Sequence, residues 1–136
     1  MFTLNSTVEY SLLFLGYLKG KDGYVSLNEV AEKLSLPRRF LARLSAALAR
    51  EEVVVSKEGK AGGYKLGRKA EDITLYEFFQ IVEGKKFLVK CADESFVCRH
   101  KDVCRHKNFF LALDKTLRNE FAKYKLVDVL KYYAQA

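Results

Sequence analysis

The stretch from Ser26 to Arg50 constrains the fold of this chain more than any other part of the sequence. Ser26 and Glu29 stand at the spacing of a capping box, in which each side chain bonds the backbone N–H of the other residue. A short helix should follow, whose inner face is formed by Val30, Ala31 and Leu34. A two-residue turn comes next, and Pro37 fits the start of a second helix because its missing N–H costs little there.

The second helix, over residues 37–50, is predicted to be amphipathic. Its apolar side chains recur at helical spacing, at Leu41, Leu44 and Leu48. Arg39 and Arg43 project from the opposite face. Two short helices joined by a tight turn, with arginines on the outer face of the second, are typical of a helix-turn-helix.

A two-stranded wing should follow the second helix. Residues 53–56 are a short β-branched run, residues 57–63 form a basic turn that contains glycine, and residues 64–66 read as a returning strand. An isolated hairpin is only marginally stable in water. We therefore expect this wing to pack against the helices.

Positive charge is concentrated around these elements. The formal net charge is +7, and residues 35–69 carry nine Lys or Arg against three Asp or Glu. A concentrated basic patch favours an anionic partner, because Lys and Arg at phosphates release condensed counterions. A well-solvated surface is the alternative, and charge alone does not decide between the two.

Four further helices are predicted outside this segment. Residues 6–19 are apolar on nearly every side, which favours burial on more than one face, with a second subunit as the expected cover. A capping box at residues 74–77 opens a helix that ends at Gly84. A long helix is predicted over residues 107–124, and its apolar residues recur at a spacing close to that of a coiled coil. We interpret it as a helix that pairs with its copy in a dimer; packing on its own domain is the alternative. A last short helix is expected within residues 126–133.

All three cysteines, Cys91, Cys98 and Cys104, lie in residues 85–106, which show no clean helical or strand period. Loops of this length are usually functional or disordered. No secretion signal and no segment of ~20 apolar residues is visible, so we expect a cytoplasmic protein without a membrane partner. An odd, tightly grouped set of thiols in that reducing compartment favours a metal or redox site over a disulfide framework.

Thiolates suit iron–sulfur clusters, Cu(I) and zinc. The cysteines are separated by six and five residues, which is wider than the pairs of most zinc sites, so zinc is the lesser alternative and three ordinary free cysteines are the third. Three cysteines cannot complete a site with four ligands. His106, close to Cys104, could supply a neutral imidazole, and His100 is a weaker candidate.

The order of these parts resembles the Rrf-two family of winged-helix transcription regulators, with its IscR-like, NsrR-like and RirA-like members. The matching segments cover nearly the whole chain and are specific as an ordered set. They are the helix-turn-helix of residues 26–48, the wing sequence Gly62-Gly63-Tyr64-Lys65-Leu66, the segment Ile73-Thr74-Leu75, the segment Val82-Glu83-Gly84, and the three cysteines.

The resemblance implies a mainly α-helical fold with a small β-wing. A winged helix-turn-helix DNA-binding domain would span residues 1–84, a cysteine-containing cluster loop residues 85–106, and a dimerisation helix with a C-terminal tail residues 107–136. It also implies a homodimer and a [2Fe–2S] or [4Fe–4S] cluster held by the three cysteines.

Two residues compete as the fourth ligand of that cluster. In IscR-like members a histidine follows the last cysteine by three positions, whereas His106 follows Cys104 by two. In NsrR-like members an acidic residue of the first helix reaches the cluster of the partner subunit, and Glu9 matches that position. Otherwise Glu9 is a polar residue that favours a helix start. We keep both residues as candidates.

DNA contacts are expected along the second helix and the wing. Arginines facing the major groove can pair with guanine O6 and N7, and a methyl group can contact only apolar base edges. By resemblance, Arg39, Ala42 and Arg43 read bases, and a wing arginine of IscR-like members is replaced here by Glu58. The full set of predicted DNA-binding residues is Arg38, Arg39, Ala42, Arg43, Arg50, Lys57, Lys60, Gly62, Gly63, Tyr64 and Lys65.

The sequence thus predicts a homodimeric transcription regulator, either a repressor or an activator, that binds a roughly palindromic operator in double-stranded DNA. An iron–sulfur cluster would sense redox state, nitric oxide or iron supply. The alternative is a winged-helix regulator controlled by a partner protein or an effector, with zinc or no metal in the cysteine loop. An enzyme is not expected, since no phosphate loop, triad or pair of catalytic carboxylates is present.

Overall fold

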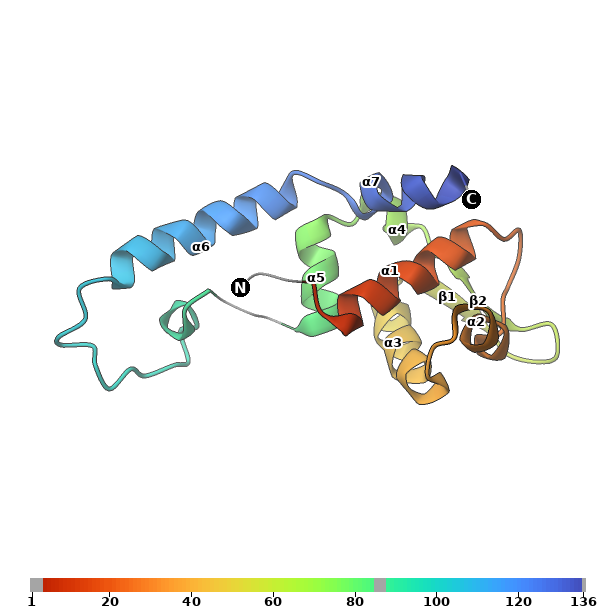
Figure 1. Ribbon diagram of the computed structural model, residues 1–136, viewed down its shortest axis with the longest axis horizontal. Coiled ribbons are helices and arrows are strands. Elements are labelled where there is room, and N and C mark those ends of the chain that lie inside the picture. The colour runs from red at the N-terminus through yellow and green to blue at the C-terminus, as the bar shows by residue number, and fades with distance from the viewer. Residues whose placement is uncertain (1–3, 85–87, 136) are drawn as a thin grey trace.

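The structure, a computed structural model, describes residues 4–84 and 88–135; residues 85–87 of the predicted loop lie outside the described residues. It is mostly helical, with one small antiparallel sheet (Figure 1). The elements in chain order are α1 (Ser6–Lys19), α2 (Leu27–Leu34), α3 (Arg38–Arg50), β1 (Val54–Lys57), β2 (Gly63–Leu66), α4 (Lys69–Asp72), α5 (Leu75–Glu83), the 3-10 turn η1 (Lys90–Ala92), α6 (Lys107–Ala122), α7 (Leu126–Leu130) and the 3-10 turn η2 (Lys131–Gln135).

Helix α1 forms the centre of the core, as its apolar sequence predicts. Phe14, Leu15 and Leu18 are fully buried, and the helix packs on α2, α5, β2, α7 and η2. The chain's own C-terminal segment therefore covers much of the apolar surface for which the sequence suggested a second subunit. Leu13 stays exposed on the remaining face.

The helix-turn-helix forms with one difference from the predicted caps. The Ser26 hydroxyl accepts from the Glu29 N–H at 3.2 Å, as expected. The return bond of the capping box is not among the hydrogen bonds of the described residues. The Glu29 carboxylate instead accepts from the Tyr17 hydroxyl of α1 at 2.6 Å. A long-range contact has replaced a local one, and it ties α2 to α1.

The wing is a two-stranded antiparallel sheet, in which Val54 pairs with Leu66 and Lys57 with Gly63. Each strand lies within one residue of its predicted bounds. The Tyr64 ring packs edge-on against Phe14 of α1, with ring centroids 6.2 Å apart. This contact supplies the attachment to the helices that a short hairpin needs.

The reciprocal capping box at Thr74 and Glu77 is confirmed, with both hydrogen bonds at 3.1–3.2 Å. It starts α5, which Gly84 ends as predicted. The four-residue helix α4 was not predicted, because one turn has too few residues to show a period. It is anchored by its single buried side chain, Ala70.

Helix α6 confirms the predicted long helix, ending two residues early, and it extends outward from the winged domain (Figure 1). The chain returns through α7, whose Leu126 and Leu130 are buried in the core. Within the described residues, no helix is both long enough and apolar enough to cross a bilayer.

The C-terminal turn packs directly on α1 at Gly16, where an added Cβ would overlap the Tyr133 ring. Alanine inside a helix is normally about 1 kcal/mol more stable than glycine. We predict the opposite sign here: Gly16→Ala should lower the free energy of unfolding by about 1–3 kcal/mol, because the Tyr133 ring must be displaced. Urea denaturation measures the change.

Gly23→Ala is the matched control, because a Cβ at Gly23 meets no atom within 4 Å. Its stability should equal or slightly exceed that of the native chain. Adding Tyr133→Ala to Gly16→Ala should remove most of the difference between the alanine and glycine forms. A stabilised Gly16→Ala variant would show that Tyr133 does not pack on this site.

Candidate nucleic-acid interface and cysteine loop

Helix α3 lies with its apolar face against the core and its arginine face toward solvent. Leu41, Leu44 and Leu48 are buried, as the spacing predicts. Residues on the other face are exposed, and they include the predicted DNA-contacting residues Arg38, Arg39, Ala42, Arg43 and Arg50. The helix therefore presents a basic surface on a rigid support.

The orientation of α2 relative to α1 depends on Tyr17 and Glu29. The hydrogen bond from the Tyr17 hydroxyl to the Glu29 carboxylate raises the pKa of Tyr17, with burial and the negative charge of Glu29 adding to the shift. The Lys21 ammonium lies 5.0 Å from the Tyr17 ring centroid and 4.0 Å from the Glu29 carboxylate. These contacts hold the first helix of the helix-turn-helix in place.

The glycines of the wing allow close approaches between backbones. Gly63 has φ +141°, and a Cβ there would overlap the Val25 carbonyl. At Gly62 a Cβ would overlap the Lys57 carbonyl across the turn. Both glycines and Tyr64 thus shape the wing itself, and their predicted contacts with DNA stay predictions.

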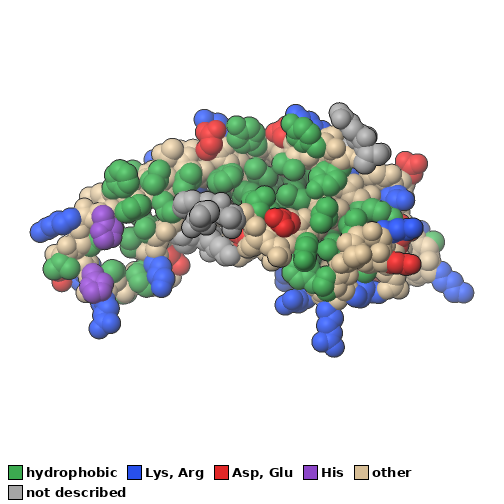
Figure 2. Space-filling view, viewed as in Figure 1, with side chains coloured by type: hydrophobic (Ala, Val, Ile, Leu, Met, Phe, Trp, Pro, Cys, Tyr) green, Lys and Arg blue, Asp and Glu red, His purple; other side chains and the backbone are tan. Residues whose placement is uncertain are grey.

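The wing lysines Lys57, Lys60 and Lys65 are exposed, as is Glu58 at the turn. In Figure 2, Lys and Arg side chains project from the end of the molecule that contains α3 and the wing. The structure therefore brings the predicted DNA residues of α3 and of the wing to one end of the fold. The two histidines lie at the opposite end, on the cysteine loop.

In the cysteine loop, residues 88–106, all three thiols are free and half-buried. The His100 N–H donates to Cys98 Sγ at 3.4 Å, and the His100 carbonyl accepts from the Cys104 N–H at 2.9 Å. Cys98 and Cys104 are thus both bonded to one residue. Cys91 lies apart from them in the chain, in η1.

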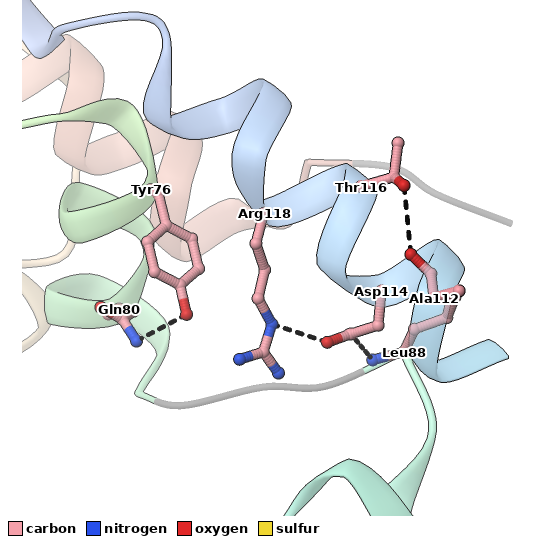
Figure 3. A network of polar contacts seen from close by, with 7 residues as sticks. All are labelled: Tyr76, Gln80, Leu88, Ala112, Asp114, Thr116 and Arg118. Carbon is pink, nitrogen blue, oxygen red and sulfur yellow. Dashed lines mark hydrogen bonds and ion pairs between the residues drawn. The ribbon is translucent and has the colours of Figure 1, made fainter. Parts of the chain in front are cut away.

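Asp114 fastens the start of this loop to α6 (Figure 3). Its carboxylate accepts from the Leu88 N–H at 2.7 Å and pairs with Arg118 Nε at 2.6 Å. Asp114 is the one buried carboxylate among the described residues, with 7% of its surface exposed. A buried charge needs such partners, so the loop is tied to α6 at a defined point.

The other end of α6 is fastened to the start of α5. Thr74 and Lys125 form an antiparallel bridge, in which the Leu75 N–H donates to the Tyr124 carbonyl at 2.8 Å and the Leu126 N–H to the Ile73 carbonyl at 3.0 Å. Edge-on stacking of Phe79 on Phe121, at 5.2 Å between centroids, adds a side-chain contact. Helix α5 therefore contacts the end of α6 and also packs on α3.

The two candidate fourth ligands lie in different elements. Glu9 is exposed in the first turn of α1. His106 precedes α6, and its ring packs edge-on against Phe110 at 5.8 Å. Across the described residues of this single chain, no three His, Cys, Asp or Glu side chains are gathered around a point that could hold a metal ion. The donor chemistry of three half-buried thiols nevertheless suits iron and sulfide.

Sequence reasoning missed Asp114 and the bridge between Thr74 and Lys125. The only local signal of Asp114 is its position four residues before Arg118, a common helical ion pair. Its bond to Leu88 joins residues 26 positions apart, which no local pattern encodes. The bridge joins residues still further apart in the chain.

A cavity of about 830 Å³ lies between α3, α4 and α5. Its apolar lining includes Ala47, Ile73 and Ile81. Charged residues of both signs stand among the lining, namely Arg50, Glu51, Lys69, Asp72 and Glu77. The cavity touches the end of α3 and the end of α5.

The family model Rrf2, described as an iron-dependent transcriptional regulator, matches residues 4–132. An HTH-type transcriptional regulator of Aquifex aeolicus is 33% identical over 78 residues, which are 57% of this chain and 54% of that relative. The chain thus spans about half the length of this relative.

Two solved structures are similar to the fold as a whole. CymR of B. subtilis, titled the global cysteine regulator, superposes with a TM-score of 0.71 at 22% identity, over 97% of this chain and 98% of CymR. IscR of T. potens superposes with a TM-score of 0.65 at 25% identity, over 96% of this chain and 87% of IscR. The CymR match supports the winged-helix fold alone.

Removal of the Asp114 carboxylate should loosen the cysteine loop. In Asp114→Ala the Leu88 N–H loses this acceptor and Arg118 loses its bond to Asp114, so we predict a loss of about 1–3 kcal/mol in the free energy of unfolding. Amide hydrogen exchange at Leu88 should accelerate. Asp114→Asn retains an acceptor for Leu88 and should slow that exchange again.

Glu120→Ala is the control on the same helix, because Glu120 pairs with Lys123 at 2.8 Å on an exposed surface. Exposed pairs contribute little, so both stability and Leu88 exchange should stay near those of the native chain. Equal behaviour of Asp114→Ala and Glu120→Ala would contradict the anchoring of the loop by Asp114.

Proposed function

Because this chain belongs to the Rrf2 family of transcription regulators, we propose that it is a homodimeric regulator whose cysteine loop holds an iron–sulfur cluster. Its relatives are named as transcriptional regulators, so it is a DNA-binding regulator and not an enzyme. The observation that carries the finer proposal is the attachment of a loop with every cysteine of the chain to α6 through Asp114.

DNA is read by α3 in the major groove. Arg39 and Arg43 can each bond guanine O6 and N7, while Ala42 offers only a methyl contact. The exposed cations Arg38, Arg50, Lys57, Lys60 and Lys65 bind phosphates and fix the register on the duplex. Rigid packing of Leu41, Leu44 and Leu48 supports this reading surface.

A second copy of the chain covers the outer face of α6. Phe109 and Leu113 of α6 are exposed in the single chain, Phe109 with 68% of its surface, and the part of Phe121 that does not pack on Phe79 is exposed as well. In Figure 2 hydrophobic side chains run across this face. Pairing of two such helices would place two copies of α3 side by side, as a palindromic operator requires.

The three thiolates are suitable ligands for a cluster, and the N–H of His100 already donates to Cys98 Sγ. Such hydrogen bonds to sulfur tune iron–sulfur centres. Glu9 of the partner subunit or His106 would complete the ligand set. A bound cluster would supply redox-active iron that oxygen, nitric oxide or iron shortage can alter. Because one cluster needs all three thiolates around a single centre, binding it would draw residues 88–106 together.

A movement of the loop on cluster binding can be transmitted to the DNA-reading helix α3 through α5. The loop is bonded to α6 at Asp114, α6 ends at the bridge between Thr74 and Lys125, and α5 packs on α3. A shift of α6 therefore acts on the first residues of α5. Since two α3 helices must match half-sites about one turn apart, a small shift changes affinity.

The alternative is control by an effector or a partner protein, with zinc or no metal in the loop. The cavity of about 830 Å³ between α3, α4 and α5 favours it, because an occupant there would contact the same helices that transmit the signal. Chemical analysis of anaerobically purified protein separates the two proposals. Iron with sulfide and visible absorption supports the cluster; a colourless protein with zinc or no metal supports the alternative.

Loss of one cysteine should abolish both the cluster and its effect on DNA. We predict that Cys98→Ser, reconstituted anaerobically, retains little iron and sulfide, and that its operator affinity no longer differs from that of the cluster-free native chain. Val103→Ala is the matched control, since it alters a neighbouring, 70% exposed side chain of the loop and leaves all three thiols and both histidines. Equal operator affinity of the native protein with and without cluster, across salt concentrations, would reject the switch.

Loss of a base-reading arginine should relax sequence preference. We predict that Arg43→Ala weakens binding to an operator selected from random sequence by about 1–3 kcal/mol, with a much smaller loss on non-operator DNA. Lys115→Ala removes the same charge from α6, away from the reading surface, and should leave the preference intact. If both variants lose affinity equally on both duplexes, Arg43 does not read bases.

A further inference from the structure

Tyr24 lies between α1 and α2, beside the wing. The next residue, Val25, pairs with Tyr64 of β2 through two backbone hydrogen bonds of 2.8 Å, which adds one residue to the edge of the sheet. Val25 is buried. Because successive side chains of an extended segment point to opposite faces, Tyr24 lies on the outer face, and continuing this register places it opposite Lys65.

Two lysine side chains meet on the Tyr24 ring. The ammonium of Lys65 lies 4.8 Å from the ring centroid and that of Lys57 lies 5.7 Å from it. In the hairpin Val55 pairs with Lys65, and Lys57 is two residues from Val55, so both lysines share the outer face. Cations at these distances are attracted by the electron-rich face of the ring.

The positive charges of Lys57 and Lys65 lie close together at the Tyr24 ring and are not neutralised by a carboxylate of the described residues. Among the described residues, neither Lys57 nor Lys65 forms an ion pair with a carboxylate. Both side chains are exposed, whereas Tyr24 is half-buried and held by the bonds of Val25. The half-buried ring thus brings the ammonium groups of two long side chains to one place, and their mutual repulsion is relieved when an anion lies between them.

We propose that Tyr24, Lys57 and Lys65 form a single phosphate-binding site for the DNA backbone at the base of the wing, in which Tyr24 is the positioning residue. This site rests on the proposed binding of double-stranded DNA. Lys60, at the turn of the wing, lacks a comparable aromatic support among the described contacts. The site gives the wing a phosphate contact although Glu58 occupies its tip.

The test is a double-mutant cycle on binding to a labelled mixed-sequence duplex of about three helical turns, measured by fluorescence anisotropy over a series of salt concentrations. A phosphate contact is independent of base sequence, so no operator is needed. Tyr24→Leu should weaken binding by roughly five- to tenfold and reduce the salt slope by about one. Tyr24→Phe keeps the ring and should bind as the native chain does.

The decisive comparison is made in the Lys57→Gln, Lys65→Gln background. There Tyr24→Leu should cause little further loss, because the lysines that it positions are gone. A purely structural role of Tyr24 predicts the same loss in both backgrounds, and that result would overturn the proposal. A Tyr24→Phe variant as weak as Tyr24→Leu would also overturn it, since the ring would not be the active group.

Tyr132→Leu is the matched control, because Lys131 lies 5.6 Å from the Tyr132 ring centroid in the C-terminal turn. It should change neither affinity nor salt slope. A native chain that binds no duplex would refute DNA binding and this site together. A native chain that binds normally while Tyr24→Leu is unchanged would refute the site alone and leave the proposed function standing.

Discussion

The backbone bridge between Thr74 and Lys125 is the constraint on which the rest of the structure depends. Two hydrogen bonds there fasten the end of α6 to the start of α5, within a capping box that also fixes the first turn of α5. Beyond this point α7 enters the core, and Tyr133 closes over Gly16 of α1. The described part of the chain between α5 and the end of α6 therefore leaves the core at the end of α5 and returns to the start of the same helix.

This arrangement connects two distant surfaces of the molecule. The arginines of α3 and the lysines of the wing lie at one end of the molecule, and the cysteine loop lies at the other (Figures 1 and 2). Helix α5 contacts both α6 and α3. At the loop, the buried carboxylate of Asp114 bonds both Leu88 and Arg118, and so connects the loop to α6.

The elements governed by local patterns were predictable from the sequence. The leucine spacing placed α3, the box at Thr74 and Glu77 placed α5, and the glycines and β-branched run placed the wing within a residue. The residue pairs that join distant segments were not predictable from the sequence. Glu29 bonds Tyr17 instead of the start of its own helix, and Asp114 bonds Leu88. Such contacts depend on the assembled fold, so no spacing of residues reveals them.

We propose that the state of the cysteine loop acts on α3 through α5. Amide hydrogen exchange of the anaerobically prepared protein, compared with and without its iron, tests this directly. We expect altered exchange in residues 88–106, at the Leu75 amide of the bridge, and in α3. Changes confined to residues 88–106, with Leu75 and α3 unaffected, would contradict it.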